Sequence, residues 1–110
     1  MTRRREVRLS ADALRDLGDI CDYIVEHDSL AKSEYVMDRL LEVIDSLETN
    51  PMRGGHPREL LAAGLAGCRQ AFFKPYRVVY VVGDAIVHIL LIADGRRDLR
   101  TLLAQRLLDA

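Results

Sequence analysis

Five side chains in the second half of this 110-residue chain could act on an anion. They are four arginines and one histidine: Arg69, Arg77, Arg96, Arg97 and His88. Guanidinium groups bind phosphate and carboxylate oxygens through charge-assisted hydrogen bonds. Histidine is the side chain that most readily exchanges a proton near neutral pH. The residue types therefore predict an anion-binding surface, and His88 is the one candidate within the strand region for acid–base chemistry.

The overall charge limits what that surface can do. Residues 1–50 carry seven basic and twelve acidic side chains, whereas residues 51–110 carry nine basic and five acidic ones. The total is near neutral and the pI is about 6.3, which argues against a protein whose main partner is a polyphosphate. Acidic side chains at Asp16, Asp19, Asp22 and Glu26 discourage a phosphate backbone from approaching the first half. Any nucleic-acid contact is expected on the arginine side.

Each candidate also has a structural interpretation. Arg96 and Arg97 are flanked by Asp94 and Asp98, so local ion pairs would anchor this loop to the helix that follows. Arg69 and Arg77 are expected to have an ion partner wherever they are buried, because an isolated interior charge is costly. Carboxylates of the first two helices or of a partner would satisfy both. Counted from a turn at Gly83-Asp84, His88 pairs with Val79 and shares a face with Arg77, and a core or edge histidine is its structural alternative.

Nothing in the sequence predicts a metal or a cofactor. Cys21 and Cys68 have neither disulfide-framework nor zinc-ligand spacing and are expected to be small buried hydrophobes. The histidines are scattered along the chain. No apolar run approaches the roughly 20 residues of a membrane span, and the basic N-terminus lacks the apolar segment of a signal peptide. We expect one domain over residues 1–110, without a membrane segment, in the cytoplasm.

Two amphipathic helices must support this surface. Arg5–Leu9 alternates charged and apolar residues, as a half-exposed strand does. Ser10 then offers an N-cap, and apolar residues recur at helical spacing from Leu14 to Val25. Asp28-Ser29 predicts a stop and a second cap before another amphipathic helix, which ends near Pro51. The short link predicts an antiparallel helix hairpin.

The second half changes to strands. A loop over residues 51–57 and a helical turn near Leu60 precede three apolar runs, which Lys74-Pro75 and Gly83-Asp84 separate. A short helix from Leu99 ends the chain. The order β-α-α-β-β-β-α predicts an α+β fold in which the helix hairpin packs on an antiparallel meander. The two faces of the second and third runs are both apolar: one with Val78, Val82, Val87, Ile89 and Leu91, the other with Val79, Val81, Ile86 and Leu90.

This pattern resembles the RelE/ParE toxin superfamily over essentially the whole chain. The specific parts are Tyr76-Arg77-Val78-Val79-Tyr80 and Gly95-Arg96-Arg97-Asp98-Leu99, one hairpin apart after a helix pair. The resemblance implies the toxin of a type II toxin–antitoxin system, neutralised by a cognate antitoxin such as a ribbon-helix-helix, ParD-like protein. It also implies one of two targets, because RelE-like members are ribosome-dependent mRNA endonucleases and ParE-like members inhibit DNA gyrase.

The residues favour the gyrase branch. Cleavage of RNA needs a base, an acid and cations near the phosphate. Arg77 and the Arg96–Arg97 pair match cation positions of the RelE-like pattern. However, the strand Cys68–Phe72 lacks the lysines of the RelE-like pattern. Leu102 and Leu103 stand near the position where that pattern has a C-terminal aromatic residue. Asp94 also replaces a histidine found in many ParE-like members.

We therefore predict a ParE-like gyrase inhibitor without catalysis of its own, using Arg69, Arg77, Arg96 and Arg97 for its target or antitoxin. The alternative is a RelE-like mRNA endonuclease that relies on Arg77, His88 and Arg97. A further alternative is a degenerate toxin retained as an antitoxin-binding module. The short C-terminal helix is expected to leave part of the second sheet face open, and an antitoxin segment would cover it as a helix or as an added strand.

Overall fold

The computed structural model describes residues 4–108, and its centre is a four-stranded sheet with the strand order β1-β4-β3-β2. Strands β2 (Cys68–Phe73), β3 (Tyr76–Val82) and β4 (Ile86–Asp94) form the predicted antiparallel meander. Strand β1 (Glu6–Leu9) joins its edge by pairing in parallel with β4. The predicted α+β architecture is confirmed, and the parallel placement of β1 is a feature that the sequence pattern did not specify.

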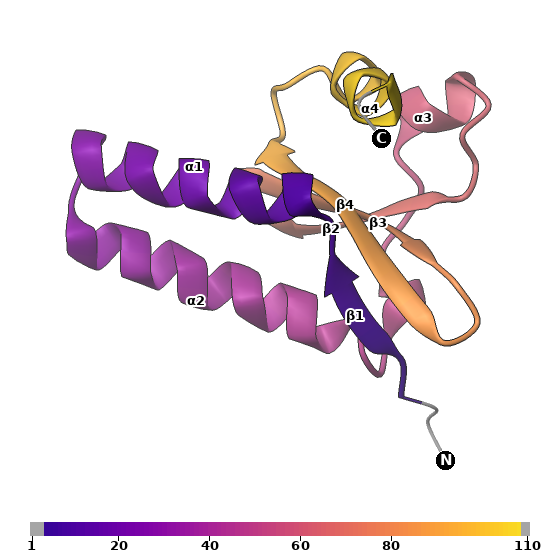
Figure 1. The fold of residues 1–110 in the computed structure, drawn as a ribbon, viewed down its shortest axis with the longest axis horizontal. Coiled ribbons are helices and arrows are strands. Elements are labelled where there is room, and N and C mark those ends of the chain that lie inside the picture. The colour runs from indigo at the N-terminus through magenta and orange to yellow at the C-terminus, as the bar shows by residue number, and fades with distance from the viewer. Residues whose placement is uncertain (1–3, 109–110) are drawn as a thin grey trace.

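Helices cover both faces of this sheet (Figure 1). The hairpin of α1 (Ala11–His27) and α2 (Leu30–Ser46) lies on one face, with α1 over β4 and α2 over β2. The other face carries α3 (Arg58–Ala62) and α4 (Leu99–Leu108), and a 3-10 turn, η1 (Pro51–Arg53), follows α2. Both predicted serine caps are present, because the Ser10 and Ser29 hydroxyls accept hydrogen bonds from the amides of Ala13 and Lys32.

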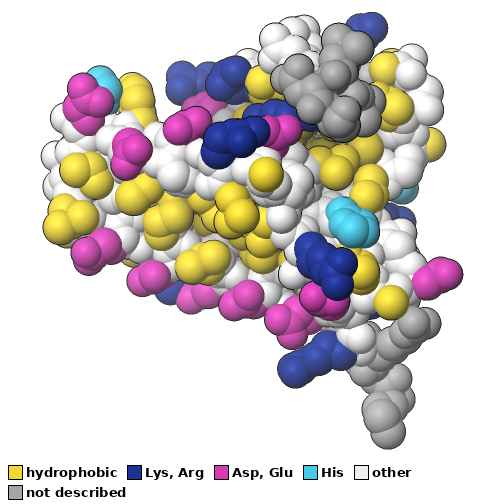
Figure 2. Space-filling view, viewed as in Figure 1, with side chains coloured by type: hydrophobic (Ala, Val, Ile, Leu, Met, Phe, Trp, Pro, Cys, Tyr) yellow, Lys and Arg dark blue, Asp and Glu magenta, His cyan; other side chains and the backbone are white. Residues whose placement is uncertain are grey.

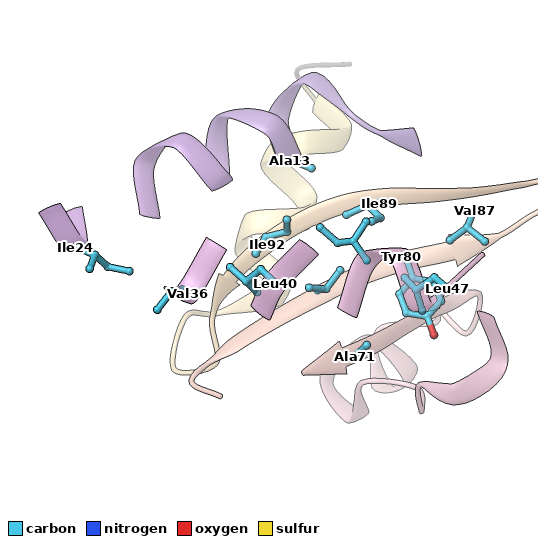
Figure 3. Packing of buried hydrophobic residues seen from close by; sticks show 12 residues of the cluster. Ala13, Ile24, Val36, Leu40, Leu47, Ala71, Tyr80, Val87, Ile89 and Ile92 are labelled. Carbon is cyan, nitrogen blue, oxygen red and sulfur yellow. The ribbon is translucent and has the colours of Figure 1, made fainter. Parts of the chain in front are cut away.

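The sheet separates two apolar cores. The larger one packs the helix hairpin on the sheet, and Figure 3 shows side chains of α1 and α2 meeting those of β2, β3 and β4. The smaller one joins α3 and α4 to Val79, Leu91 and Ala93, all of which are buried. The expectation of an open second sheet face is corrected for most of that face: α3 reinforces α4, and Val81 and Leu90 are partly buried there, whereas Phe72, the cross-strand partner of Arg77, stays 46% exposed.

The β3–β4 hairpin differs from its predicted register. The amide of Gly83 donates to the carbonyl of Ile86, so the two-residue tip is Asp84-Ala85, one position later than predicted. His88 consequently faces Val81 and not Val79. An irregularity at Val79/Tyr80 then shifts the pairing, and Leu91 joins the core beneath α3 and α4 instead of the face predicted for it.

The loop after α2 is tied to the middle of the sheet by Tyr80. The buried Tyr80 hydroxyl donates to the carbonyl of Pro51 at 2.6 Å and accepts from the amide of Gly54 at 3.2 Å. The Arg69 guanidinium donates to the carbonyl of Gly54 at 2.7 Å. Gly54 passes so close to β2 that a Cβ at this position would overlap the backbone oxygen of Gln70. The loop is therefore held from two strands at once.

Side chains cap the edge of β4 where β1 ends. The Ser10 hydroxyl donates to the carbonyl of Leu90, and the Asp16 carboxylate accepts from the amide of Ile92 at 2.9 Å. Arg106 of α4 donates to both carboxylate oxygens of Asp16, at 2.7 and 3.0 Å, and to the carbonyl of Leu90. One ion pair thus connects α4, α1 and the free part of β4, and it satisfies backbone groups that no neighbouring strand reaches.

Candidate functional site

Arg77 lies at the end of the sheet, on the face covered by α3. It pairs with Ala93 across the ladder, and its guanidinium donates to the carboxylate of Glu59 in α3. Its side chain is 20% exposed, and its Nε finds no hydrogen-bond acceptor within residues 4–108. The ion partner is therefore a carboxylate of the same chain, but it comes from α3 and not from the predicted helix hairpin.

The Arg77 contact also sets the ionisation of Glu59. Burial opposes the charged form, but hydrogen bonds from its own backbone amide and from Arg77 outweigh burial, so the pKa of Glu59 lies below its usual value. Glu59 is thus ionised at neutral pH and neutralises Arg77. This pairing makes Arg77 less available to an external anion than its sequence motif suggests.

We expect Glu59→Gln to lower the free energy of unfolding by about 1 kcal/mol at pH 7, because it removes a partly exposed ion pair. A carboxylate whose folded-state pKa is lowered stabilises the fold above its unfolded-state pKa, near 4.3. That contribution disappears as the pH falls through the lower folded-state pKa. Urea unfolding at pH 7 and pH 3 measures this, and the two proteins should converge in acid. A constant difference at both pH values would contradict the assignment.

Arg96 and Arg97 lie on the loop between β4 and α4. Arg96 donates through Nε and Nη2 to the carboxylate of Asp94, at 3.0 and 3.1 Å, yet its side chain is 90% exposed. The hydrogen bond from the Arg96 side chain is the main reason that the pKa of Asp94 is lowered, and the charge of Arg97 adds to it. The predicted local pairing is thus confirmed for Arg96. Asp98 instead caps α4, accepting from the amides of Arg100 and Thr101.

A hollow of about 420 Å³ connects this loop to α1. Its lining combines the arginine pair with acidic and aromatic side chains: Asp16, Asp19, Ile20, Tyr23, Tyr76, Ile92, Ala93, Asp94, Arg96 and Arg97. Burial, followed by the charge of Asp94, raises the pKa of Tyr76. Its phenol therefore stays protonated and can donate a hydrogen bond, but it is a poor general base. The hollow is suited to binding polar groups next to an aromatic surface.

The remaining predicted residues lie outside this site. Arg69 is on the face of β2 opposite to Arg77, and its donors are directed at the carbonyls of Gly54 and Met52. His88 is exposed and lies opposite Val81, whereas Arg77 lies opposite Ala93. Four residues of β3 separate the two positions, or about 13 Å. The predicted proximity of His88 and Arg77 is wrong, because it rested on the earlier turn position.

The structure adds Glu59, Tyr76, Tyr23 and Asp19 to the site. Tyr76 precedes Arg77 in the motif, so alternation along a strand places it on the opposite face, toward α1. Glu59 carried no signal, since its helix is only five residues long. Within residues 4–108 no group of three or more His, Cys, Asp or Glu side chains is arranged to hold a metal ion. No helix in the same range is long and apolar enough to cross a membrane.

Taken together, the fold and this site define a small α+β protein with a cationic loop beside a helix hairpin. Residues 7–99 match the family described as the ParE toxin of the type II toxin–antitoxin system parDE. The chain therefore belongs to the ParE toxin family and is the toxin of a type II toxin–antitoxin system. A comparison with curated proteins gives no match.

Solved structures share the fold. One is a chain of the chromosomal ParDE system from P. aeruginosa, with a TM-score of 0.70 and 20% identity, covering 84% of this chain and 98% of that one. Another is a chain of the toxin–antitoxin complex RelBE2 from Mycobacterium tuberculosis, with a TM-score of 0.61 and 24% identity, covering 83% and 98%. At these identities the likeness extends to the fold alone.

Proposed function

We propose that this toxin inhibits DNA gyrase in the cytoplasm by binding to it, without catalysing a reaction itself. The observation that carries the proposal is the composition of the arginine loop. Arg96 and Arg97 are exposed, while His88 lies about 13 Å along the sheet from Arg77 and Tyr76 is held protonated. Cations are thus available for an anionic surface, and no histidine is among the residues that line the hollow beside them.

The same geometry weighs against mRNA cleavage. A RelE-like reaction through Arg77, His88 and Arg97 requires these groups around one phosphate. Arg77 is already neutralised by Glu59, and His88 is remote from it. We assign the target contact chiefly to Arg96 and Arg97, and we assign Arg69 a structural role in the 51–54 loop.

We further propose that a cognate antitoxin neutralises the toxin by direct binding. Membership of the ParE family supports this, and the two solved relatives come from a ParDE system and from a RelBE2 toxin–antitoxin complex. A ribbon-helix-helix, ParD-like protein encoded beside the toxin fits the proposal.

Purified toxin is expected to inhibit gyrase supercoiling, and the double variant Arg96→Ala/Arg97→Ala should raise the inhibitory concentration at least tenfold. His88→Ala should inhibit like the wild type, because this side chain lies outside the site. Absence of inhibition at a stoichiometric excess over gyrase would contradict the proposal.

Codon-positioned mRNA cuts in a ribosome assay, lost in Arg77→Ala, would establish the endonuclease instead. Normal growth on induction without antitoxin would point to a degenerate toxin.

A further inference from the structure

A second hollow lies at the end of the helix hairpin where α1 is linked to α2. It has a volume of about 420 Å³ and extends from this link to the β2–β3 turn at Lys74-Pro75. Ile24 and Val36, both buried and adjacent in Figure 3, contribute apolar surface to it. Its wall consists of aromatic and cationic side chains: Tyr23, His27, Lys32, Phe73, Lys74 and Tyr76. We call this hollow the lysine pocket, and its size suits one small ligand.

The pocket contains both lysines of the chain. Lys32 and Lys74 are exposed, and none of the ion pairs between residues 4 and 108 involves either of them. The ammonium of Lys32 lies 5.5 Å from the centroid of the Tyr35 ring, and Tyr35 contacts Phe73 edge-on with the ring centroids 6.1 Å apart. These contacts hold Lys32 beside the pocket wall. The carboxylate of Asp28 also lines the pocket, so two positive charges face one negative charge.

The two arginines of the hairpin are less available to an anion than these lysines. Arg15 and Arg39 contact the carboxylates of Asp12 and Glu42 within their own helices. Figure 2 shows acidic side chains along the lower margin of α2, where an anion would be repelled. The lysine pocket is therefore the part of the hairpin where an anionic group would be retained.

Aromatic surface is exposed in the same pocket. Tyr23 is 62% exposed and stacks on His27, with the ring centroids 4.1 Å apart and the planes at 19°. The Nδ1 of His27 lies 3.0 Å from the carbonyl oxygen of Tyr23. Because a carbonyl oxygen only accepts, Nδ1 is the donor, and Nε2 of the neutral ring is left as an acceptor. A planar ligand ring would extend this stack and cover its exposed surface.

The cationic and aromatic features together select the ligand. A nucleotide offers a planar base to the stacked rings and a phosphate to the two ammonium groups. An acidic peptide would use the lysines but leave the rings uncovered. Duplex DNA keeps its bases stacked inside the helix, so it has no base to insert. Two lysines suit one phosphate and not a polyphosphate, in agreement with the pI of about 6.3.

We propose that the lysine pocket binds one nucleotide, with its base on the Tyr23–His27 stack and its phosphate between the two lysines. The nucleotide is a free one or the unpaired end of a nucleic-acid strand, since both present the same groups. Tyr23 and Tyr76 also line the hollow beside the arginine loop, so a longer strand would continue toward that loop. Binding at this pocket is independent of gyrase and is tested with the toxin alone.

Calorimetry with purified toxin measures the affinity for AMP, and adenosine and inorganic phosphate represent the two halves of this ligand. AMP should bind about tenfold more tightly than either half, because each half uses only one side of the pocket. Lys32→Ala/Lys74→Ala should weaken AMP binding about tenfold and reduce its dependence on salt. Arg8→Ala/Arg100→Ala, which removes two exposed positive charges elsewhere, is the matched control and should leave AMP binding unaltered.

The aromatic surface has its own pair of variants. Tyr23→Ala should weaken AMP binding about fivefold, whereas Tyr23→Phe, which keeps the ring, should bind AMP like the wild type. AMP should also slow the acetylation of the two lysines, as followed by mass spectrometry. Circular dichroism shows whether each variant keeps the wild-type fold.

A single-stranded pentanucleotide of deoxyadenosine identifies the source of the nucleotide. Tighter binding than that of AMP would assign the pocket to a strand end, and equal or weaker binding would assign it to a free nucleotide. Wild-type AMP affinity in folded Lys32→Ala/Lys74→Ala would overturn the nucleotide site. Inorganic phosphate or pentaglutamate binding as tightly as AMP would overturn it too, in favour of a plain anion site or an acidic peptide. The same conclusion follows if wild-type toxin binds neither AMP nor the pentanucleotide.

Discussion

Gly54→Ala is expected to destabilise the toxin by about 3 kcal/mol, because its new methyl group would occupy space already filled by the sheet. The added Cβ would overlap the carbonyl oxygen of Gln70 and lie 2.6 Å from the Tyr80 hydroxyl. Backbone atoms of β2 cannot move aside without breaking the ladder. The loop must move instead, and the hydrogen bonds of Tyr80 to Pro51 and Gly54 are then lost. Urea unfolding monitored by circular dichroism measures this loss.

The neighbouring glycine provides the control. A Cβ on Gly55 would meet no atom within 4 Å, so Gly55→Ala should change the free energy of unfolding by less than about 0.5 kcal/mol. Equal losses in the two variants would show that alanine is poorly tolerated anywhere in this loop. In that case, the close approach of Gly54 to β2 would not be what holds the loop.

Asp16→Ala is the second substitution with a large expected effect, a loss of about 3 kcal/mol. The Asp16 and Arg106 side chains are only 14% and 21% exposed. Removing the carboxylate takes from Arg106 its two hydrogen bonds to Asp16 and deprives the amide of Ile92 of its acceptor. The loss should appear as a lower urea midpoint.

Asp19→Ala, in the same helix but exposed, is the matched control and should be nearly neutral. Asp16→Asn should fall between the two, since its amide oxygen can still accept from Ile92 while the charge is gone. A double-mutant cycle with Arg106→Ala isolates the coupling between the partners. Strict additivity of the two single changes would mean that the ion pair does not hold α4 to α1.

The features that the sequence predicts well depend on local chemistry. Ser10 and Ser29 cap the two long helices because their hydroxyls precede apolar-periodic segments. The strand runs and Lys74-Pro75 define the meander, and the Arg77 and Arg96–Arg97 segments meet at one end of the sheet, where a Cβ on Gly95 would lie 3.5 Å from the Nε of Arg77. Family, fold and arginine loop could all be inferred from these signals.

The features that the sequence did not reveal depend on contacts between distant residues. The turn at Asp84-Ala85 was misplaced by one residue, which was enough to move His88 away from Arg77. Glu59 pairs with Arg77 only because α3 folds back over β3, and no local pattern signals that. Likewise, α3 and α4 together cover most of the sheet face that was predicted to stay open, although Phe72 remains 46% exposed on it.

The capping of β4 also affects how the molecule behaves at high concentration. A bare strand edge is a template on which identical chains polymerise. Beyond Leu9, where β1 ends, this edge is closed by Ser10, Asp16 and Arg106 instead of by another strand. An incoming chain would first have to detach the last turns of α4, so the sheet is protected there against fibril-like growth by side chains alone.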